Sequence, residues 1–173
     1  ICLERTNRSP AGSIAFQEGF FTIQGASSAL VAPLLEPRPG DILFDLCSAP
    51  GGKTTHLSEL IGDEGTIYAF DLHESRVKLV TKAANRLNLR SIKTVATDAR
   101  LIRSLPLPTP RGILVDAPCS GLGVIARLPE IKWRRQEKDL LFFQQDQLAL
   151  LQAAAEVLAP GGTLIYSVCT TEP

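Results

Sequence analysis

Five short apolar runs, separated by stretches with helical spacing, limit the fold of this chain more than any other feature. Each run has the length of a strand and lacks strict alternation of apolar and polar residues, as in parallel strands buried on both faces. The sequence therefore predicts an α/β fold with a Rossmann-like, doubly wound, mostly parallel sheet. The expected strands are Ile42–Leu46, Thr66–Phe70, Ile92–Ala96, Gly112–Val115 and Thr163–Val168.

Three longer segments between these runs carry helical patterns. In the second of them, Val77, Val80, Ala84 and Leu87 recur at helical spacing, and the third is followed by the breaker sequence Ala-Pro-Gly-Gly at 159–162. Strands that alternate with helices in this way are typical of parallel sheets. The expected helices are Lys53–Ile61, Glu74–Leu87 and Phe142–Leu158.

Residues 1–40 are richer in proline than the rest, and we expect them to form a leader that packs on the core, with a helix across Ser27–Leu35. Residues 41–173 are expected to form one catalytic domain. Because a sheet of this type usually continues beyond a fifth strand, we expect a fragment of a longer protein, truncated after that strand.

Charge and cysteine content exclude several classes of protein. Eighteen basic residues balance eighteen acidic ones, so nucleic acid could be bound only through a local surface. No apolar run is long enough to span a membrane and the start does not resemble a secretion signal, which predicts a cytoplasmic protein without membrane contact. The four cysteines are scattered, without the spacing of a metal site or of a disulfide framework.

A loop rich in small residues, Asp45–Thr54 (DLCSAPGGKT), follows the first expected strand and opens a helix. Such a loop lets a ligand approach the backbone and the positive end of the helix. A nucleoside triphosphate is one candidate, because Cys47–Thr54 matches the phosphate-binding pattern G-x-x-x-x-G-K-[ST] except at its first position. Ile113–Asp116 could then supply the magnesium-binding acid. The missing first glycine counts against this hypothesis.

A nucleoside cofactor is the favoured alternative. Asp71 ends the second strand, where an acid can hold ribose hydroxyls, and Asp98 ends the third, where it could bind an adenine edge. Either acid alone could be an ordinary turn residue, but that explanation is poor for both together. Acids around the site suit S-adenosylmethionine, which carries a sulfonium cation. Lys53 could contact the carboxylate of this cofactor or support the loop.

Two cysteines follow the fourth and fifth strands, Cys119 after Asp116-Ala117-Pro118 and Cys169 after Val168. If these strands are neighbours, a spacing of about 4.8 Å places both thiols at one pocket mouth. A thiolate that adds to C6 of a cytosine makes C5 nucleophilic enough to accept a methyl group. Asp116 could bind the amino or N3 edge of the base, which must be single-stranded or flipped. The residues alone leave open which thiol attacks.

An amino-group methyltransferase is a related alternative. Such enzymes usually have an aromatic residue at the position of Cys119, which this sequence lacks.

Five motifs in order resemble the Sun/RsmB-type family of RNA cytosine-C5 methyltransferases, and the segment Phe16–Leu35 also looks like the one that precedes the cofactor loop there. Members usually carry an RNA-binding domain before this core and further strands after it. The motifs are Asp45–Thr54 (DLCSAPGGKT), Phe70–Arg76 (FDLHESR), Ala96–Arg100 (ATDAR), Val115–Gly123 (VDAPCSGLG) and Tyr166–Thr171 (YSVCTT).

The resemblance implies that Cys169 attacks C6 and that Cys119 helps to resolve the covalent adduct. It also implies S-adenosylmethionine as cofactor and RNA, foremost ribosomal RNA, as substrate. The cofactor contacts that it implies are Cys47, Ser48, Ala49, Pro50, Gly51, Gly52, Lys53, Asp71, Arg76, Asp98 and Asp116.

A cluster of basic residues around a tryptophan lies between the fourth strand and the last helix. It is typical of a surface that binds single-stranded RNA, which is the favoured interpretation, and a solvated loop with a partly buried tryptophan is the alternative. A non-catalytic RNA-binding module is therefore a third hypothesis. The cluster comprises Arg127, Lys132, Trp133, Arg134, Arg135 and Lys138.

Overall fold

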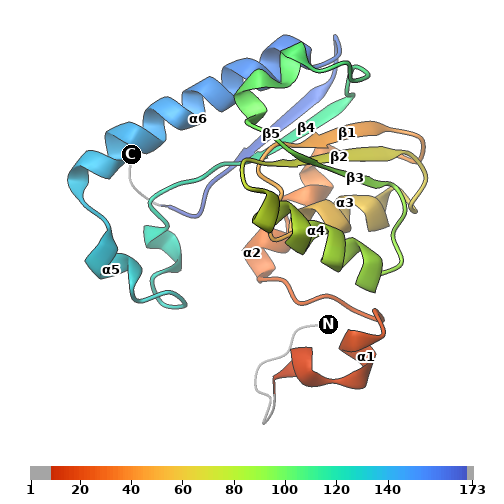
Figure 1. Ribbon diagram of the computed structural model, residues 1–173, viewed down its shortest axis with the longest axis horizontal. Coiled ribbons are helices and arrows are strands. Elements are labelled where there is room, and N and C mark those ends of the chain that lie inside the picture. Colours follow the sequence, from red (N-terminus) through yellow and green to blue (C-terminus); the bar gives the residue numbers. More distant parts are fainter. Residues whose placement is uncertain (1–8, 171–173) are drawn as a thin grey trace.

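The computed structural model describes residues 9–170, and Figure 1 shows their arrangement around one sheet. The five strands pair in the order β3-β2-β1-β4-β5, and each neighbouring pair is parallel. The predicted doubly wound parallel sheet is thus confirmed, with strand ends within two residues of those expected. The strands are β1 (Ile42–Asp45), β2 (Thr66–Asp71), β3 (Ile92–Ala96), β4 (Gly112–Asp116) and β5 (Thr163–Ser167).

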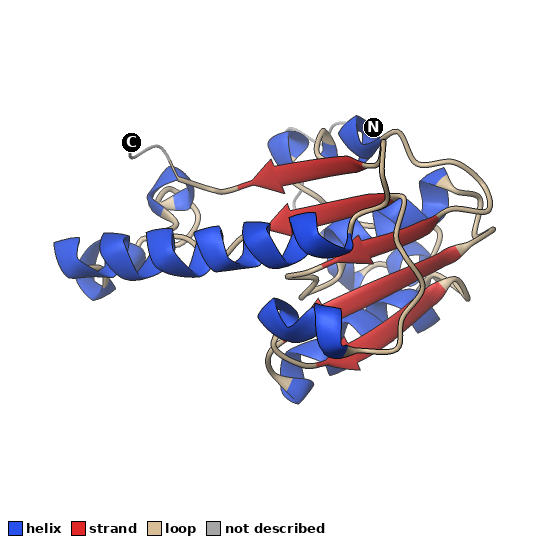
Figure 2. Cartoon of the chain, turned by 90° about the horizontal axis from the view of Figure 1, so that it is seen from above, coloured by secondary structure: helices blue, strands red, loops and turns tan. Residues whose placement is uncertain are grey.

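Helices cover both faces of the sheet (Figures 1 and 2). On one face lie α3 (Gly52–Leu60) and α4 (Glu74–Arg86), and on the other lie the 3₁₀ helix η3 (Ala99–Ser104) and α6 (Glu137–Val157). Shorter turns of helix are η1 (Pro10–Gly12), α1 (Ile14–Gln17), α2 (Ala26–Ala29), η2 (Ala32–Leu35), η4 (Leu122–Val124) and α5 (Ile131–Arg134).

The core has two layers because successive strand residues point to opposite faces of the sheet. Phe44 and Ile113 pack with α6 and η3, whereas their neighbours Leu43 and Leu114 pack with α3 and η2. Burial on both faces explains why the strands show no apolar-polar alternation.

The expected helix across Ser27–Leu35 is wrong, since α2 and η2 are two separate turns. Pro33 has no N–H to donate, and its ring would clash with the carbonyl four residues earlier in a continuous α-helix. Ala32 and Leu35 of η2 are nevertheless fully buried beside α3.

Helix α6 begins at Glu137, five residues before the expected start at Phe142. A capping box explains the earlier start, since Gln136 and Asp139 each bond to the other's backbone. The extra turns extend beyond the arrowheads that mark the carboxyl ends of the strands (Figure 2). This projecting half of α6 and the nearby α5 form an arm on the side of the sheet where β4 and β5 end (Figure 1).

Candidate active site

The thiols of Cys119 and Cys169 lie side by side beyond the ends of β4 and β5, with 3.2 Å between their sulfur atoms. Strand adjacency brings them together, as the spacing argument predicted. Cys119 is 8% exposed and Cys169 is exposed, and both are free. Cys119 is therefore buried behind Cys169, and a ligand can approach the pair from the side of Cys169.

Two further contacts join the loops that carry these thiols. The backbone N–H of Gly123 donates to the carbonyl of Cys169 at 3.1 Å, and the hydroxyls of Ser120 and Thr170 are 2.7 Å apart. A side chain at Gly123 would place its Cβ 2.9 Å from that carbonyl oxygen. Glycine is therefore required where the loops meet.

Burial is the main cause that raises the pKa of the Cys169 thiol to about 11, and the hydrogen bond with Cys119 and the charges of Cys119 and Asp116 contribute to this shift in the same direction. Cys169 is thus a protonated thiol at neutral pH in the ligand-free chain. It becomes a nucleophile only when a base or a bound substrate helps to remove its proton.

Both oxygens of the Asp116 carboxylate have partners. Lys53 Nζ lies 2.6 Å from Oδ2, and the hydroxyl of Ser167, its register neighbour on β5, donates to Oδ1 at 2.7 Å. Lys53 is only 16% exposed, so this ion pair joins the glycine-rich loop to the strand that leads to Cys119. Two partners give this acid a defined orientation at the edge of the sheet.

The loop 47–53 is shaped by the fold itself. Gly51 has a φ of +109°, and a Cβ there would lie 3.1 Å from Cα of Val80 on α4. Ser48 is buried, and both its N–H and its hydroxyl donate to the carbonyl of Phe70 at 2.8 Å. Cys47 is half-buried, and burial raises the pKa of its thiol well above the ordinary value. At Gly52, by contrast, an added Cβ would meet only the Gln24 side-chain nitrogen, at 4.0 Å.

Asp71 at the end of β2 is bound by Arg76. The guanidinium Nε lies 2.9 Å from Oδ2, and the same side chain donates to the carbonyl of Ala49 at 3.1 Å. Pro50 follows Ala49 through a cis peptide bond. Asp71, Arg76 and Ala49, which are cofactor contacts according to the family resemblance, therefore form one network at the glycine-rich loop.

Asp98 after β3 is held by Arg100, whose hydrogen bonds lower the pKa of this carboxyl. Nη2 of Arg100 lies 2.6 Å from Asp98, and Nη1 lies 3.0 Å from Asp146 on α6. A ligand that uses Asp98 must share it with Arg100 or displace that side chain. Arg100 is the last residue of the family motif Ala96–Arg100, whereas no pattern in the sequence indicates that Asp146 belongs to this site.

Trp133 on α5 is 82% exposed, so the alternative in which this tryptophan is partly buried is wrong. Lys132 lies over its ring at 5.4 Å. Arg135 donates to the carbonyl of Ser120 at 2.8 Å, next to Cys119, and also lies over the ring of Phe143. The projecting arm thus combines cations and aromatic rings beside the thiols, together with a hollow of about 200 Å³ that Ser120, Lys132 and Arg135 help to line.

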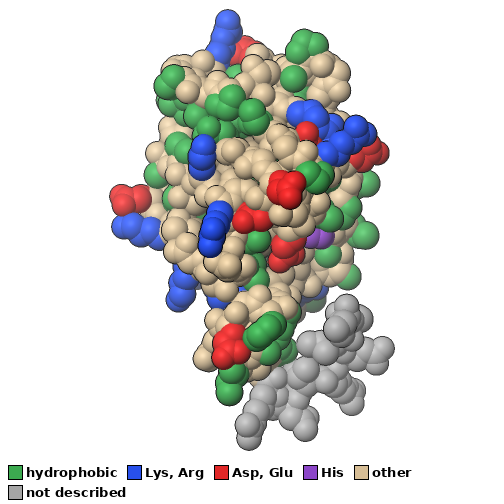
Figure 3. All heavy atoms as spheres, turned by 90° about the vertical axis from the view of Figure 1, so that its right-hand side faces the viewer, with side chains coloured by type: hydrophobic (Ala, Val, Ile, Leu, Met, Phe, Trp, Pro, Cys, Tyr) green, Lys and Arg blue, Asp and Glu red, His purple; other side chains and the backbone are tan. Residues whose placement is uncertain are grey.

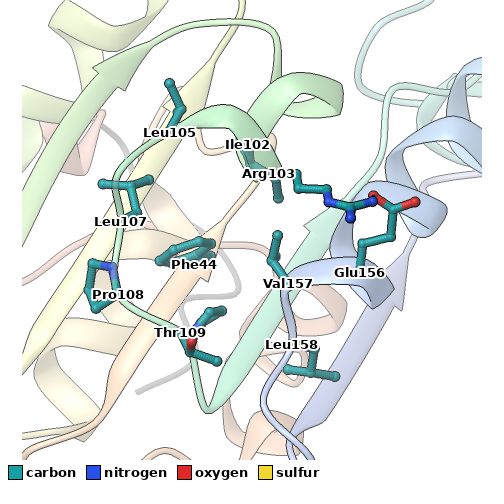
Figure 4. Close-up of a pocket in the computed structure, with 11 residues that line it drawn as sticks. Phe44, Ile102, Arg103, Leu105, Leu107, Pro108, Thr109, Glu156, Val157 and Leu158 are labelled. Atoms are coloured by element: carbon teal, nitrogen blue, oxygen red, sulfur yellow. The ribbon is translucent and has the colours of Figure 1, made fainter.

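A second hollow of about 240 Å³ lies at the opposite ends of β4 and β5 (Figure 4). Most of the residues around it are apolar, among them Phe44, and the ion pair of Arg103 and Glu156 lies at one side. It contains none of the acids or thiols described above, and it is separate from them.

Charges of both signs are mixed over the face shown in Figure 3, consistent with their equal numbers in the chain. Within residues 9–170, no group of three His, Cys, Asp or Glu side chains could hold a metal ion. No helix in the same range is long and apolar enough to cross a membrane. Cys2 lies outside the described residues.

The strand order reverses between β1 and β4, and the glycine-rich loop and the acids lie at the carboxyl ends of the strands on either side of that point. Doubly wound α/β proteins bind nucleotide and nucleoside ligands at such a switch point. The fold and the site therefore define a nucleoside-binding protein of the Rossmann-like class.

Residues 32–173 match the family described as 16S rRNA methyltransferase RsmB/F. The chain belongs to this family. A Synechocystis relative, named "Probable ribosomal RNA small subunit methyltransferase B", is 43% identical over 159 residues, which are 91% of the chain and 36% of the relative. The tRNA (cytosine(72)-C(5))-methyltransferase of Pyrococcus horikoshii is 38% identical over 90% of the chain and 39% of its own length.

Solved structures show the same architecture. The crystal structure of NSun6 from Pyrococcus horikoshii with SFG has a TM-score of 0.87 and 36% identity, and the match covers 95% of the chain and 42% of that protein. The structure of PH0851 has a TM-score of 0.92 and 37% identity, with 96% and 38% covered. The chain thus spans somewhat more than a third of the relatives that it matches. Family membership leaves the nucleoside triphosphatase hypothesis without support.

Proposed function

We propose that this chain is the catalytic core of an S-adenosylmethionine-dependent enzyme that methylates C5 of a cytosine in RNA. The observation that carries the proposal is the pair of sulfur atoms 3.2 Å apart, with Asp116 anchored at the same edge of the sheet. Amino-group methylation gives no use for two thiols, whereas C5 methylation needs one thiol to attack and a second group to assist release.

In the proposed reaction, Cys169 is the nucleophile, as the family resemblance implies, and its greater exposure supports this role. Its thiolate forms a bond to C6, and the C5 carbon becomes electron-rich. Asp116 hydrogen-bonds the amino or N3 edge of the base and so favours this addition. After methylation, a base takes the C5 proton, the electron pair of the C5–H bond re-forms the C5=C6 double bond, and the C6–sulfur bond breaks to release Cys169 as a thiolate. Cys119 assists this last step.

The residues at the switch point fit S-adenosylmethionine, which supplies an electrophilic methyl group when bound. Asp71 is suited to ribose hydroxyls and Asp98 to the adenine, while Gly52 leaves room for close approach of a ligand to the backbone. The other proposed contacts are Cys47, Ser48, Ala49, Pro50, Gly51, Lys53, Arg76 and Asp116. The structure of NSun6 from Pyrococcus horikoshii contains SFG, an analogue of this cofactor, and so supports the proposal.

The substrate that we propose is ribosomal RNA, which the name of the Synechocystis relative also contains. The methyltransferase of Pyrococcus horikoshii, in contrast, is named for tRNA. Trp133 and the cations around it would contact nucleotides that flank the target cytosine, because exposed aromatic rings stack unpaired bases. An RNA substrate of this kind is consistent with a cytoplasmic protein. We further propose that residues 1–40 are a leader and residues 41–173 the core, supported by the burial of Ala32 and Leu35 against the sheet.

Trapping of the covalent intermediate tests this function. In the full-length protein, Cys119→Ala should accumulate an RNA adduct that survives denaturation, and the additional change Cys169→Ala should abolish it. Calorimetry should show binding of S-adenosylmethionine and none of ATP with magnesium. A Cys119→Ala adduct that persists without Cys169 would reverse the two roles. Absence of any adduct, with RNA still bound, would favour the non-catalytic RNA-binding module.

A further inference from the structure

The side chain of Gln147 on α6 contacts both segments that carry the thiols. Its Nε2 donates to the carbonyl of Pro118 at 2.8 Å, and its Oε1 accepts from the hydroxyl of Tyr166 at 2.8 Å. Pro118 directly precedes Cys119, and Tyr166 lies on β5 three residues before Cys169. One carboxamide therefore connects the two thiol segments to each other through a third element of the fold.

Helix α6 is itself held in place at this turn. The preceding residue, Asp146, is bound by Arg100 at 3.0 Å, which links the helix to η3. One turn later, Leu150 is 5% exposed and packs into the core between α6 and the sheet. Gln147 therefore projects from a backbone that is anchored on both sides, and its carboxamide links the loops after β4 and β5 to that anchor.

An amide side chain supplies the two groups that these contacts use, an N–H donor and a carbonyl acceptor. A carbonyl such as that of Pro118 needs a donor, whereas the Tyr166 hydroxyl uses an acceptor here. Glutamate provides the acceptor but no donor, and leucine of similar size provides neither. The chemistry of this half-buried position thus differs from that of the exposed glutamines on the same helix.

We propose that Gln147 is a positioning residue, which sets the orientation of Cys119 relative to Cys169 and to the target base. The inference rests on the proposed function. Gln147 touches neither sulfur, and it acts through Pro118 and Tyr166. Thiol addition and thiol-assisted release both need the reacting atoms in close alignment, and a displacement of about 1 Å can reduce a rate by about 10²-fold.

The test compares Gln147→Leu, Tyr166→Phe and their double variant with Gln152→Leu, an exposed glutamine further along the same helix. In the full-length protein, kcat for methyl transfer to RNA should fall about tenfold in Gln147→Leu, while KM for S-adenosylmethionine and the melting temperature stay close to those of the control. Tyr166→Phe should lower kcat less. The double variant should resemble Gln147→Leu, because both changes break the same hydrogen bond.

A second measurement does not depend on catalysis. Iodoacetamide alkylation followed by peptide mass analysis gives the ratio of the rates at Cys119 and Cys169. We expect Gln147→Leu to change this ratio by about threefold or more, since the thiol loops lose a common anchor. Gln152→Leu should leave the ratio unchanged.

Equal kcat values for Gln147→Leu and Gln152→Leu would overturn the inference, and so would a loss of kcat that follows a matching loss of thermal stability. If the wild-type protein neither methylates RNA nor forms an adduct, the proposed function fails. The alkylation ratio then decides the positioning role alone, and an unchanged ratio in Gln147→Leu refutes it.

Discussion

Asp45, at the end of β1, should make the stability of this protein fall as pH rises. The residue is 1% exposed, Thr54 donates to its Oδ2 at 2.7 Å, and Oδ1 has no hydrogen-bond partner among the residues that the structure describes. Burial raises the pKa of Asp45 from 3.8 to about 7; the Thr54 hydroxyl opposes this shift, and the charge of Asp116 adds to it. The native state therefore holds this proton more tightly than the unfolded chain does.

The sign and size of the effect follow from linkage. Because the pKa is higher in the folded state, stability is greatest below the unfolded value, decreases as pH rises toward the folded value, and levels off above it. Each unit of pKa difference between the folded and unfolded states corresponds to about 1.4 kcal/mol. The loss of folding stability caused by Asp45 therefore grows by about 2.5 kcal/mol between about pH 5 and about pH 8. Asp45→Asn cannot ionise and removes this dependence, while its amide oxygen can still accept from Thr54.

Urea unfolding of wild type and Asp45→Asn across this pH range measures the difference directly. The free energy of unfolding of the variant, relative to wild type, should increase by about 2.5 kcal/mol from the acidic to the basic end. The variant's absolute stability does not matter for this comparison, since any cost of a buried amide is independent of pH. A difference that stays constant across the range would show that Asp45 does not titrate as its burial implies.

Three other perturbations have clear expected outcomes. Gly51→Ala should lower the free energy of unfolding by about 1–3 kcal/mol in thermal or urea denaturation, because its positive φ and the approach of Val80 disfavour a side chain; unchanged stability would contradict the backbone geometry. Asp116→Asn should accelerate alkylation of Cys169 near pH 8, since it removes a negative charge that raises the thiol pKa; a slower reaction would be inconsistent with that charge effect. Hydrogen peroxide should convert Cys119 and Cys169 into one disulfide, with two protons and two electrons passing to peroxide to form two waters, and dithiothreitol should restore activity; separate sulfinic acids in mass spectra would argue against the close sulfur pair.

Much of the fold was predictable because its determinants are local. The strands β1 to β5 carry apolar runs of strand length, and the turn after β1 carries Gly51 at a position where positive φ and close packing require a glycine. The error at Ser27–Leu35 also has a local cause, since Pro33 permits a turn of 3₁₀ helix but not a continuous α-helix.

The site was predictable in its main residues but not in their partners. Cys119 and Cys169 could be placed at one edge because each follows a strand, but the hydrogen bonds of Asp116 to Lys53 and Ser167 could not. Ser167 lies in the family motif Tyr166–Thr171, but nothing in that motif indicates that its hydroxyl donates to Asp116. Gln147 resembles the other glutamines of its helix in sequence, and only its position opposite Pro118 distinguishes it.

The sequence alone determined which segments become strands, helices and ligand-binding turns, and which chemical groups those turns present. These properties depend on residues a few positions apart, whose side-chain periodicity and backbone preferences act within one segment. Only the tertiary structure decided that β4 and β5 are neighbours, that Asp45 lies beyond the reach of water, and that Arg100 and Gln147 join η3, α6 and the thiol loops. Those relations connect residues far apart in the chain, and they exist because packing of helices on both faces of the sheet brings these segments together.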